Sequence, residues 1–451
     1  MWEVDYQENQ DVLFRGAYIR WLREYYNIKQ LDLASAIHIS NSVLSKNESG
    51  VRPMSEETFT QAIAYVKDKV DPDYHFNDDP KALDYLRKSL SDEVTAMIRL
   101  NKDRYESILN DVYDRRRELE HSRGFFIFQI MVLMREYLGV RATEIRASED
   151  AVSRERFIAI KNNLNLYTPF ERAYAMDTLS LILRDSGRFD ESQQLLELSE
   201  REAVASHNSG MLGMIYYHKI LNYIYAGQPS IALPLFDTCY QALRYMLPYR
   251  RLMYLELNRA NCYSMLGATE EAFHIYQNML EQAKDFNDER LLNAIYEEYA
   301  WNCFSTRHFE EAIQYATEFK YRQEPEQSSY YTFYPNIIVP FSWYKLKQPQ
   351  KALESIRTYF SEARTWPKEL IIPEEQLILK VLRGVILRNN SAIKRYGKSL
   401  LALIPRFPSF LAAYILELEA DYWRSQNNTD KLLACQDRLI QVLSSPEKQL
   451  L

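Results

Sequence analysis

Apolar residues near the N-terminus recur at a spacing close to the period of an α-helix. Leu13, Ala17, Leu22 and Tyr26 follow this spacing, with charged residues between them. A helical period places such residues on one face of the helix. The pattern therefore predicts a helix over residues 13–26 that buries this face against neighbouring helices.

Three shorter helical segments follow. The second predicted helix covers residues 30–37, and the third covers residues 41–48 with Ser40 as its N-cap. Gly50 can end the third helix in a left-handed conformation. A fourth helix is expected to begin near Ser55. Two short helices with a tight turn between them, inside a four-helix unit, have the geometry of a helix-turn-helix.

Farther along the chain the pattern repeats every 40 residues. Small residues occupy one position of this repeat, at Ser192, Ala232, Ala272, Ala312, Ala352 and Ala392. Five residues earlier, Gly187, Gly227 and Gly267 share the same period. Glycine permits a turn between helices, and a small residue lets two helices pack closely. We therefore expect repeated helix–turn–helix hairpins from about residue 124 onward.

The composition favours an all-α chain with several parts. Its 451 residues are too many for one compact core. The 11 Gly and 16 Pro residues are fewer than most β or nucleotide-binding α/β folds need for turns. An acidic stretch with prolines, residues 71–82, marks a boundary. We predict a helix-turn-helix, DNA-binding domain over residues 1–70, a helical linker over 71–123 and a repeat domain over 124–451.

Charge and cysteine usage narrow the possible environments. The net charge of −7 excludes a protein that covers nucleic acid with a generally basic surface. It is compatible with a local DNA-binding face. Within residues 1–70, eight Lys and Arg residues stand against ten Asp and Glu residues, so non-specific DNA affinity should be low. The four cysteines form no CxxC pair, and reduced, buried thiols are expected.

The chain shows no sign of export or membrane insertion. Its N-terminal residues are acidic and form no apolar run. No stretch approaches the roughly 20 apolar residues of a membrane span. We therefore expect a cytoplasmic protein.

Residues 11–66 resemble the XRE family of phage-repressor and Cro-like helix-turn-helix domains. The matching positions are Arg20-Trp21-Leu22-Arg23-Glu24, Gln30, Leu33-Ala34, Ser40 through Lys46, Glu48, Gly50 and Pro53. The resemblance departs at two positions. His38 stands where the turn usually has glycine, so a residue with a side chain would need a positive φ. Asn47 stands where the family usually has an apolar residue.

The XRE resemblance implies a set of DNA-binding residues: Gln30, Ser40, Asn41, Ser42, Ser45, Lys46 and Arg52. Gln30 would open the second helix and contact the DNA backbone. Short polar side chains in the first turn of the third helix would reach base edges, and Lys46 and Arg52 would meet phosphates. Arg23 and Glu48 would form an internal ion pair. The plainer alternative is that Ser40 only caps its helix and that Ser42 and Ser45 are merely solvated.

The 40-residue units resemble tetratricopeptide (TPR) repeats, most clearly over residues 266–272 and 307–312. TPR units have about 34 residues, so these units would have longer helices. Such hairpins stack into a right-handed α-solenoid with a concave, protein- or peptide-binding groove. The resemblance implies groove residues that would bind a peptide: Tyr217, Asn222, Tyr254, Asn258, Asn261, Trp301 and Asn302. Asparagine can hold a peptide main chain through its carbonyl and its amide. The alternative for each is packing between helices or plain surface.

An XRE-type domain followed by TPR-like repeats resembles the RRNPP group of bacterial regulators (Rgg, PlcR, PrgX and NprR). This likeness implies a quorum-sensing transcription regulator in which a short peptide enters the groove and changes a homodimer that binds double-stranded DNA. The seven histidines form no HExxH motif and no Gly-rich phosphate loop is present, so we expect no metal, no cofactor and no enzymatic activity. Two alternatives remain: a protein-binding adaptor with a vestigial helix-turn-helix, and a ligand-free repressor of a phage or toxin locus.

Overall fold

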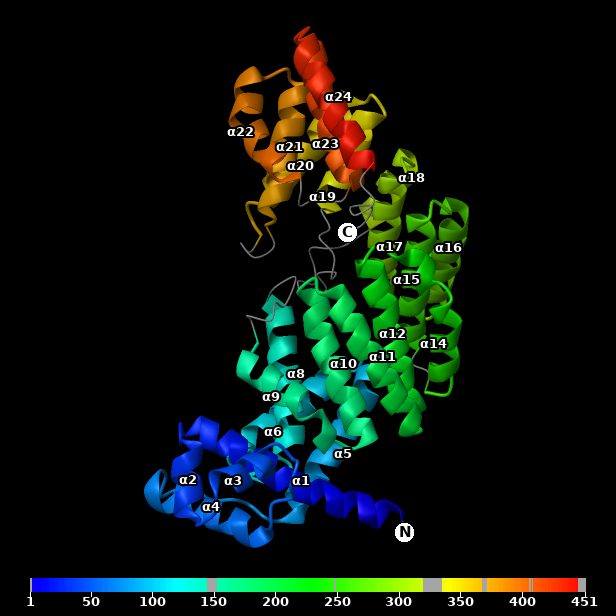
Figure 1. The fold of residues 1–451 in the computed structure, drawn as a ribbon. Helices are drawn as coiled ribbons and strands as arrows, with labels where there is room; N and C mark the ends of the chain where they lie inside the picture. The colour runs from blue at the N-terminus through cyan, green and yellow to red at the C-terminus, as the bar shows by residue number, and fades with distance from the viewer. Residues whose placement is uncertain are drawn as a thin grey trace. The chain divides into compact units, whose positions relative to one another are not determined.

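The computed structural model describes residues 2–143, 152–246, 249–318, 335–366, 371–404, 407 and 409–444. Over these ranges the chain is built from α-helices and short turns, and a single bridge between Asn77 and Ser122 is the nearest approach to a β-ladder. Figure 1 shows the helices in chain order. The predicted all-α, TPR-like fold is confirmed. The chain divides into two compact units, Met1–Lys219 with Asp237–Pro248, and Ile220–Phe236 with Tyr249–Leu451.

The first unit begins with the four predicted helices of the helix-turn-helix. They are α1 (Trp2–Tyr25), α2 (Gln30–Ala36), α3 (Asn41–Glu48) and α4 (Glu56–Lys69). The Ser40 hydroxyl accepts a hydrogen bond from the Val43 amide at 3.2 Å, and Ser55 caps α4 in the same way. Gly50 has the expected left-handed φ of 72°. The only large difference is that α1 starts well before the predicted residue 13.

The next helices of the first unit pack on one another. They are α5 (Pro80–Ile98), α6 (Lys102–Asp114), α7 (Arg116–Leu119), α8 (Phe125–Thr143) and α9 (Arg154–Asn162). Helices α5 and α6 form a hairpin, and both contact α8. The ring of Trp21 in α1 lies 4.2 Å, centroid to centroid, from that of Phe125 in α8. Helices α5, α6 and α7 thus follow a non-helical stretch at residues 71–79, and α5 and α6 pack against α8.

The repeats follow as helical hairpins. The pairs are α10 (Pro169–Asp185) with α11 (Phe189–Ala205), α15 (Tyr249–Met265) with α16 (Thr269–Asp285), α17 (Glu289–Ser305) with α18 (Phe309–Glu318), α19 (Pro335–Lys345) with α20 (Pro349–Glu362), α21 (Pro373–Ile386) with α22 (Asn390–Ala402), and α23 (Ser409–Ser425) with α24 (Thr429–Ser444). One further repeat consists of three helices, α12 (Ser209–Tyr225), α13 (Pro229–Ala232) and α14 (Leu235–Leu243). Pro234 lies at the break between α13 and α14, as expected of a residue that interrupts helical hydrogen bonding.

The 40-residue pattern has the predicted structural meaning. Ser192 and the alanines at 232, 272, 312 and 352 are fully buried in the helices that follow the turns, whereas Ala392, the last member of the series, is half-buried. The Ser192 hydroxyl donates to the Ser180 carbonyl of the facing helix at 2.9 Å. The turn glycines have φ of 74–78°, and the period continues at Arg307 and Lys347, which keep positive φ without being glycine.

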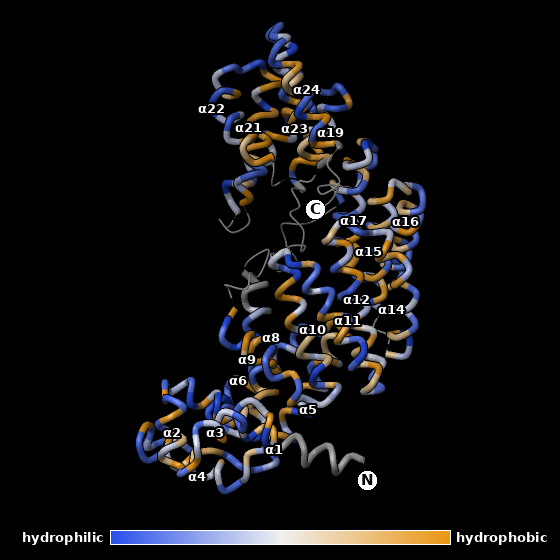
Figure 2. The backbone as a smooth tube through the Cα atoms, in the orientation of Figure 1, coloured by the Kyte–Doolittle hydropathy of each residue, from blue (hydrophilic) through white to orange (hydrophobic). Residues whose placement is uncertain are grey.

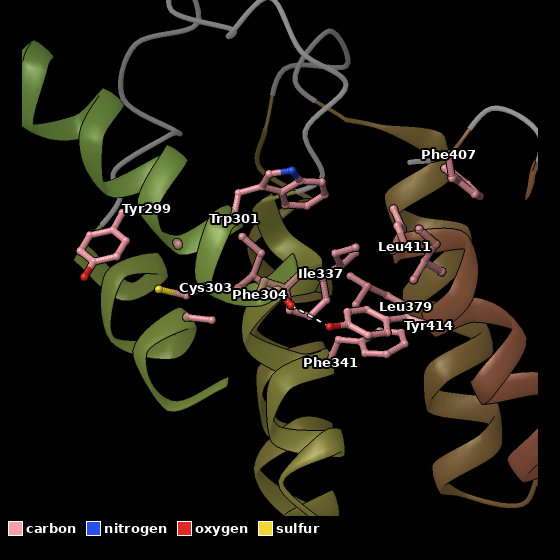
Figure 3. Close-up of a cluster of buried hydrophobic side chains, with 14 of the residues drawn as sticks. Tyr299, Trp301, Cys303, Phe304, Ile337, Phe341, Leu379, Phe407, Leu411 and Tyr414 are labelled. Carbon is pink, nitrogen blue, oxygen red and sulfur yellow. Dashed lines mark hydrogen bonds between the residues drawn. The ribbon is translucent and has the colours of Figure 1, made fainter. Parts of the chain in front are cut away.

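The second unit has one continuous apolar core, in which α23 packs against α17 and α19. Figure 3 shows the rings of Phe304, Phe341 and Tyr414 gathered in this core. The Tyr414 hydroxyl donates to the Phe304 carbonyl at 2.8 Å, although the two residues are 110 positions apart. The apolar residues of α21 and α23 that supply much of the core are visible in Figure 2. The C-terminal hairpin is thus part of the folded core of its unit.

Candidate functional site

Helix α3 carries a group of exposed polar side chains at its start. The chain enters α3 through Ser40, whose extended backbone and side-chain cap begin the helix at Asn41. Asn41, Ser42, Ser45 and Lys46 are all exposed. Their spacing of one and four residues places them along neighbouring rows of one side of the helix. This surface, which we call the α3 face, can offer hydroxyl, amide and ammonium groups to a ligand.

The opposite side of α3 is anchored in the domain core. Leu44 is completely buried, and Glu48 is buried at the end of the helix. Arg23 of α1 binds Glu48 through Nε to Oε1 at 2.9 Å and Nη2 to Oε2 at 3.1 Å. These hydrogen bonds raise the pKa of Arg23. Arg23 also donates to the Ile28 carbonyl at 3.0 Å, so the pair joins α1, the turn before α2 and α3.

The two departures from the XRE pattern have structural explanations. His38 takes the left-handed conformation, with a φ of 57°, as the glycine it replaces would. Asn47 is buried, but its Nδ2 donates to the Arg52 carbonyl at 3.0 Å and to the Pro53 carbonyl at 2.8 Å. A buried polar side chain with satisfied hydrogen bonds is compatible with a core position. Both departures are therefore accommodated without loss of the helix-turn-helix geometry.

Close backbone contact holds α1 against α3. A Cβ atom added at Gly16 would lie 2.0 Å from the Asn47 carbonyl oxygen. Only glycine allows the two helices to approach this closely at that point. Sequence reasoning did not single out Gly16, because one glycine inside a helical pattern does not reveal which backbone it meets.

Two of the predicted DNA-binding residues are already engaged within the domain. Gln30 opens α2 as expected, but its Nε2 donates to Glu48 Oε2 at 2.8 Å, beside Arg23. Ser40 is engaged as the cap of α3. The remaining five (Asn41, Ser42, Ser45, Lys46 and Arg52) are exposed in and just after α3. The Arg52 amide donates to the Lys46 carbonyl at 3.0 Å, which keeps the two cationic residues near each other along the chain.

Most of the predicted peptide-binding residues lie in contacts between helices. Asn261 accepts from the Tyr276 hydroxyl at 2.5 Å and donates to Glu298 at 3.3 Å. Asn302 donates to the same Tyr276 hydroxyl at 3.3 Å and accepts from Ser264 at 2.7 Å. Burial raises the pKa of Glu298 to about 8. These polar groups join α15, α16 and α17, so the two asparagines have a role in holding neighbouring repeats together.

Trp301 lies in the core of the second unit. Its side chain is 9% exposed and its ring makes an edge contact with Phe410 of α23, with 5.1 Å between the centroids. Figure 3 shows Trp301 on the same helix as Phe304, near the core residues of α19 and α23. The face of α17 on which the TPR pattern places Trp301 is thus covered by the C-terminal hairpin.

The other four predicted peptide-binding residues are divided between the two units. Tyr217 of the first unit is largely buried and stacks edge-on against His218. In the second unit Asn222 and Asn258 are buried, and Asn258 donates to the Tyr254 carbonyl of its own helix at 2.7 Å. Tyr254 and Asn261 are the two of the seven predicted residues that are half-buried rather than buried.

A buried pair in the first unit was missed from the sequence as a pair. His218 Nδ1 lies 2.8 Å from Asp177 Oδ1, and both side chains are buried. The residues are 41 positions apart, which is one repeat plus one residue. This spacing is the only signal that could have linked them, because it places them on successive first helices of the hairpins.

Some other kinds of site are not found in the described ranges. No group of three or more His, Cys, Asp or Glu side chains there could hold a metal ion. None of the described helices is long and apolar enough to cross a membrane. All four cysteines are unpaired and buried, as expected, and burial raises the pKa of Cys262 to about 12.

Comparison with known proteins identifies the fold. No protein-family model matches the sequence, and no characterised protein matches it by sequence. The structure is similar to the apo form of the quorum sensor NprR from B. thuringiensis, with a TM-score of 0.56 and 17% identity over 80% of this chain and 99% of that one.

Two further solved structures have the same likeness. A Rap protein complexed with Competence and Sporulation Factor has a TM-score of 0.56 and 13% identity, covering 82% of this chain and 99% of that one. The apo form of RapI has a TM-score of 0.58 and 13% identity, covering 82% and 100%. This chain therefore has the TPR-like helical fold found in NprR and the Rap proteins.

Proposed function

We propose that the protein is a DNA-binding transcription regulator whose repeats bind a short signalling peptide. The observation that carries the DNA-binding part is the α3 face: four exposed hydrogen-bonding side chains on a short helix whose other side is fixed by Leu44 and the Arg23–Glu48 pair. Short polar side chains at the start of a helix can reach base edges in the major groove. Lys46 and Arg52 would then contact phosphates.

The proposed division of labour follows the segments of the chain. Residues 1–70 would bind DNA, and residues 124–451 would bind the signalling peptide. Residues 71–123 would link these two domains. The aromatic contact between Trp21 and Phe125 supports mechanical coupling of the helix-turn-helix domain to helix α8. A ligand can shift such a protein between two arrangements only by binding one of them more tightly.

The peptide-binding part of the proposal rests on the fold and on its likeness to a quorum sensor and to a Rap protein bound to Competence and Sporulation Factor. Within the second unit, Tyr254 and Asn261 are the half-buried members of the predicted set. A tyrosine ring can pack on an apolar ligand side chain while its hydroxyl stays hydrated. We therefore place the peptide contact near Tyr254 and give Asn222, Asn258, Trp301 and Asn302 a supporting role.

A homodimer is part of the same proposal. Residues 1–70 carry fewer basic than acidic residues, so one copy of this domain would bind DNA weakly. Two helix-turn-helix heads bind half-sites about 34 Å apart. Light scattering of the full chain should give the mass of a dimer at working concentration, and a monomer would contradict this part.

The DNA-binding proposal is tested by an electrophoretic shift assay. The probe is the DNA upstream of the protein's own gene, at low salt, with wild type, Ser42→Ala and Lys46→Ala proteins. Lys69→Ala is the matched control, because it removes the same charge from the end of α4. Loss of a base contact should reduce discrimination by about 1–3 kcal/mol, and loss of a phosphate contact should lower the salt slope by about one. Equal binding by wild type and both α3 variants would refute the assignment.

The peptide proposal is tested by thermal shift with short hydrophobic peptides encoded beside the gene. A peptide at 100-fold above its Kd should add about 2.7 kcal/mol of stability. Tyr254→Ala should reduce the shift, and Tyr240→Ala, at a tyrosine that is 41% exposed, is the control. A shift that Tyr254→Ala leaves unchanged would place the peptide elsewhere.

A second candidate function is a protein-binding adaptor that does not bind DNA. The excess of acidic over basic residues in residues 1–70 favours it, and so does the likeness of the fold to the Rap proteins. The shift assay separates the two: an adaptor would leave every promoter fragment unshifted even at low salt. The same assay separates a ligand-free repressor, which would bind DNA but respond to no peptide.

A further inference from the structure

A cleft lies beside the helix-turn-helix, between α4 and the segment that follows it. Its volume is about 350 Å³. One wall is a single face of α4, with lining residues from Glu56 to Lys67 spaced three and four apart. The other wall is formed by Tyr74, His75 and Phe76, and α1 contributes Phe14 and Arg15. The α3 face does not contribute to it, so a ligand here would leave the proposed DNA contacts uncovered.

The interior of the cleft is lined by aromatic rings. Phe59 is buried, and its ring packs edge-on against Phe76 with 5.1 Å between centroids. Phe14 lies 6.4 Å from Phe76 in a tilted arrangement. Ile63 completes the apolar lining. Apolar walls with a few polar groups at the edge are typical of small-molecule sites, and this volume lies near the lower end of their range.

The edge of the cleft carries two guanidinium groups held by carboxylates that face water. Arg15 binds Glu56 at 3.3 Å, and Arg123 binds Asp78 at 2.5 Å. The arginine side chains are 22% and 32% exposed, whereas Glu56 and Asp78 are 78% and 64% exposed.

The charge of this edge favours an anion. Lys67 and His75 also line the cleft, so its basic side chains outnumber its acidic ones. Solvent-exposed ion pairs are weak. A ligand carboxylate can therefore take over one of the guanidinium groups with little loss.

We propose that this cleft binds a small aromatic or branched-chain organic anion, with its apolar part on Phe59 and Phe76 and its charged group at Arg123. The volume of the cleft limits the ligand to a small molecule. Charge complementarity selects an anion over a neutral or cationic molecule of the same shape. This site goes beyond the proposed peptide and DNA contacts, and it does not depend on either of them.

The test uses two fluorescent probes on the full-length chain. The anion 1-anilinonaphthalene-8-sulfonate is matched with its neutral relative N-phenyl-1-naphthylamine. Wild type should bind the anion saturably, with one site per chain. Ala64 is an exposed lining residue, so Ala64→Trp should fill the cleft without disturbing the core and weaken binding at least 10-fold. Ala205→Trp, at an exposed alanine of α11, is the matched control and should bind like wild type.

A charge-only variant tests the anion preference. Arg123→Gln should weaken the anionic probe several-fold and leave the neutral probe unchanged. Thr60→Trp is a second blocking variant in case Ala64→Trp folds poorly, which circular dichroism would reveal. The proposal is overturned if neither blocking variant weakens the anionic probe, because the probe then binds elsewhere. It is also overturned if Arg123→Gln leaves the anionic probe unchanged or weakens both probes equally.

Discussion

Arg23 and Glu48 form a two-point ion pair, with Nε–Oε1 at 2.9 Å and Nη2–Oε2 at 3.1 Å, that ties the first helix of the chain to the end of α3. The Arg23 side chain is 15% exposed and that of Glu48 is 4% exposed. Gln30 adds a third hydrogen bond to the same carboxylate. The orientation of the α3 face therefore depends on a small buried polar network.

Removing one partner of this pair should destabilise the helix-turn-helix domain. Arg23→Ala leaves the Glu48 carboxylate buried without its cation, and breaking such pairs costs about 3 kcal/mol. Hydrogen exchange of the α1–α3 amides measures the effect locally. Arg20→Ala is the control, because its pair with Glu24 is about half exposed and should contribute less than about 1 kcal/mol. Equal effects of the two variants would contradict the buried network.

Asn47 should make the protein more stable than an apolar residue at the same position would. Asn47→Leu would restore the apolar residue usual in XRE domains, but it would leave the Arg52 and Pro53 carbonyls without their donor. Unsatisfied buried groups cost about 1–3 kcal/mol. Thermal unfolding should therefore show a less stable protein. A variant more stable than wild type would mean that these two hydrogen bonds contribute little.

Gly16 should tolerate no larger residue. Gly16→Ala places a methyl group 2.0 Å from the Asn47 carbonyl oxygen unless α1 and α3 move apart. The same substitution at Gly139 meets no atom within 4 Å, and there alanine should stabilise helix α8 by up to about 1 kcal/mol. Opposite signs in the two melting temperatures are expected. A neutral Gly16→Ala would show that the contact between α1 and α3 is looser than the structure has it.

Glu93 should make stability depend on pH. Burial raises the pKa of Glu93 to about 8 from an ordinary 4.5, and its Oε1 accepts from the Tyr174 hydroxyl at 2.6 Å. Between these values the unfolded chain releases the proton and the folded chain keeps it. Stability should therefore fall as pH rises through this window, by at most about 1.4 kcal/mol per pH unit.

Glu93→Gln removes this titration and keeps an acceptor for Tyr174. The variant should show a flatter stability profile than wild type between pH 5 and 8 in chemical denaturation. Glu191→Gln is the control, because Glu191 is partly exposed on α11 and is paired with Arg188, an arrangement that lowers its pKa. Parallel profiles for wild type and Glu93→Gln would show that Glu93 is hydrated in solution.

Local sequence signals predicted the helices and turns well. Ser40 and Ser55 cap their helices as expected, and the glycines at 187, 227 and 267 occupy left-handed turns. These features depend on hydrogen bonds and dihedral angles within a few residues. The Arg23–Glu48 pair joins more distant residues, and it was predicted from the resemblance to the XRE family.

Contacts between distant segments could not be predicted in this way. The repeat register placed Trp301 and Asn302 on the first helix of a hairpin, but it did not reveal what covers each side of that helix. The structure places Phe410 against Trp301 and the Tyr276 hydroxyl beside Asn302. Such contacts join helices of different hairpins, and the sequence of a single repeat does not specify them.

Selection from a pool of random DNA duplexes tests the central claim most directly. The full-length protein should enrich one sequence at low salt. The triple variant Asn41→Ala, Ser42→Ala, Ser45→Ala should lose this preference, whereas Lys69→Ala should keep it. No enrichment by folded wild-type protein, or the same enriched sequence for the triple variant, would contradict the claim that the α3 face reads DNA.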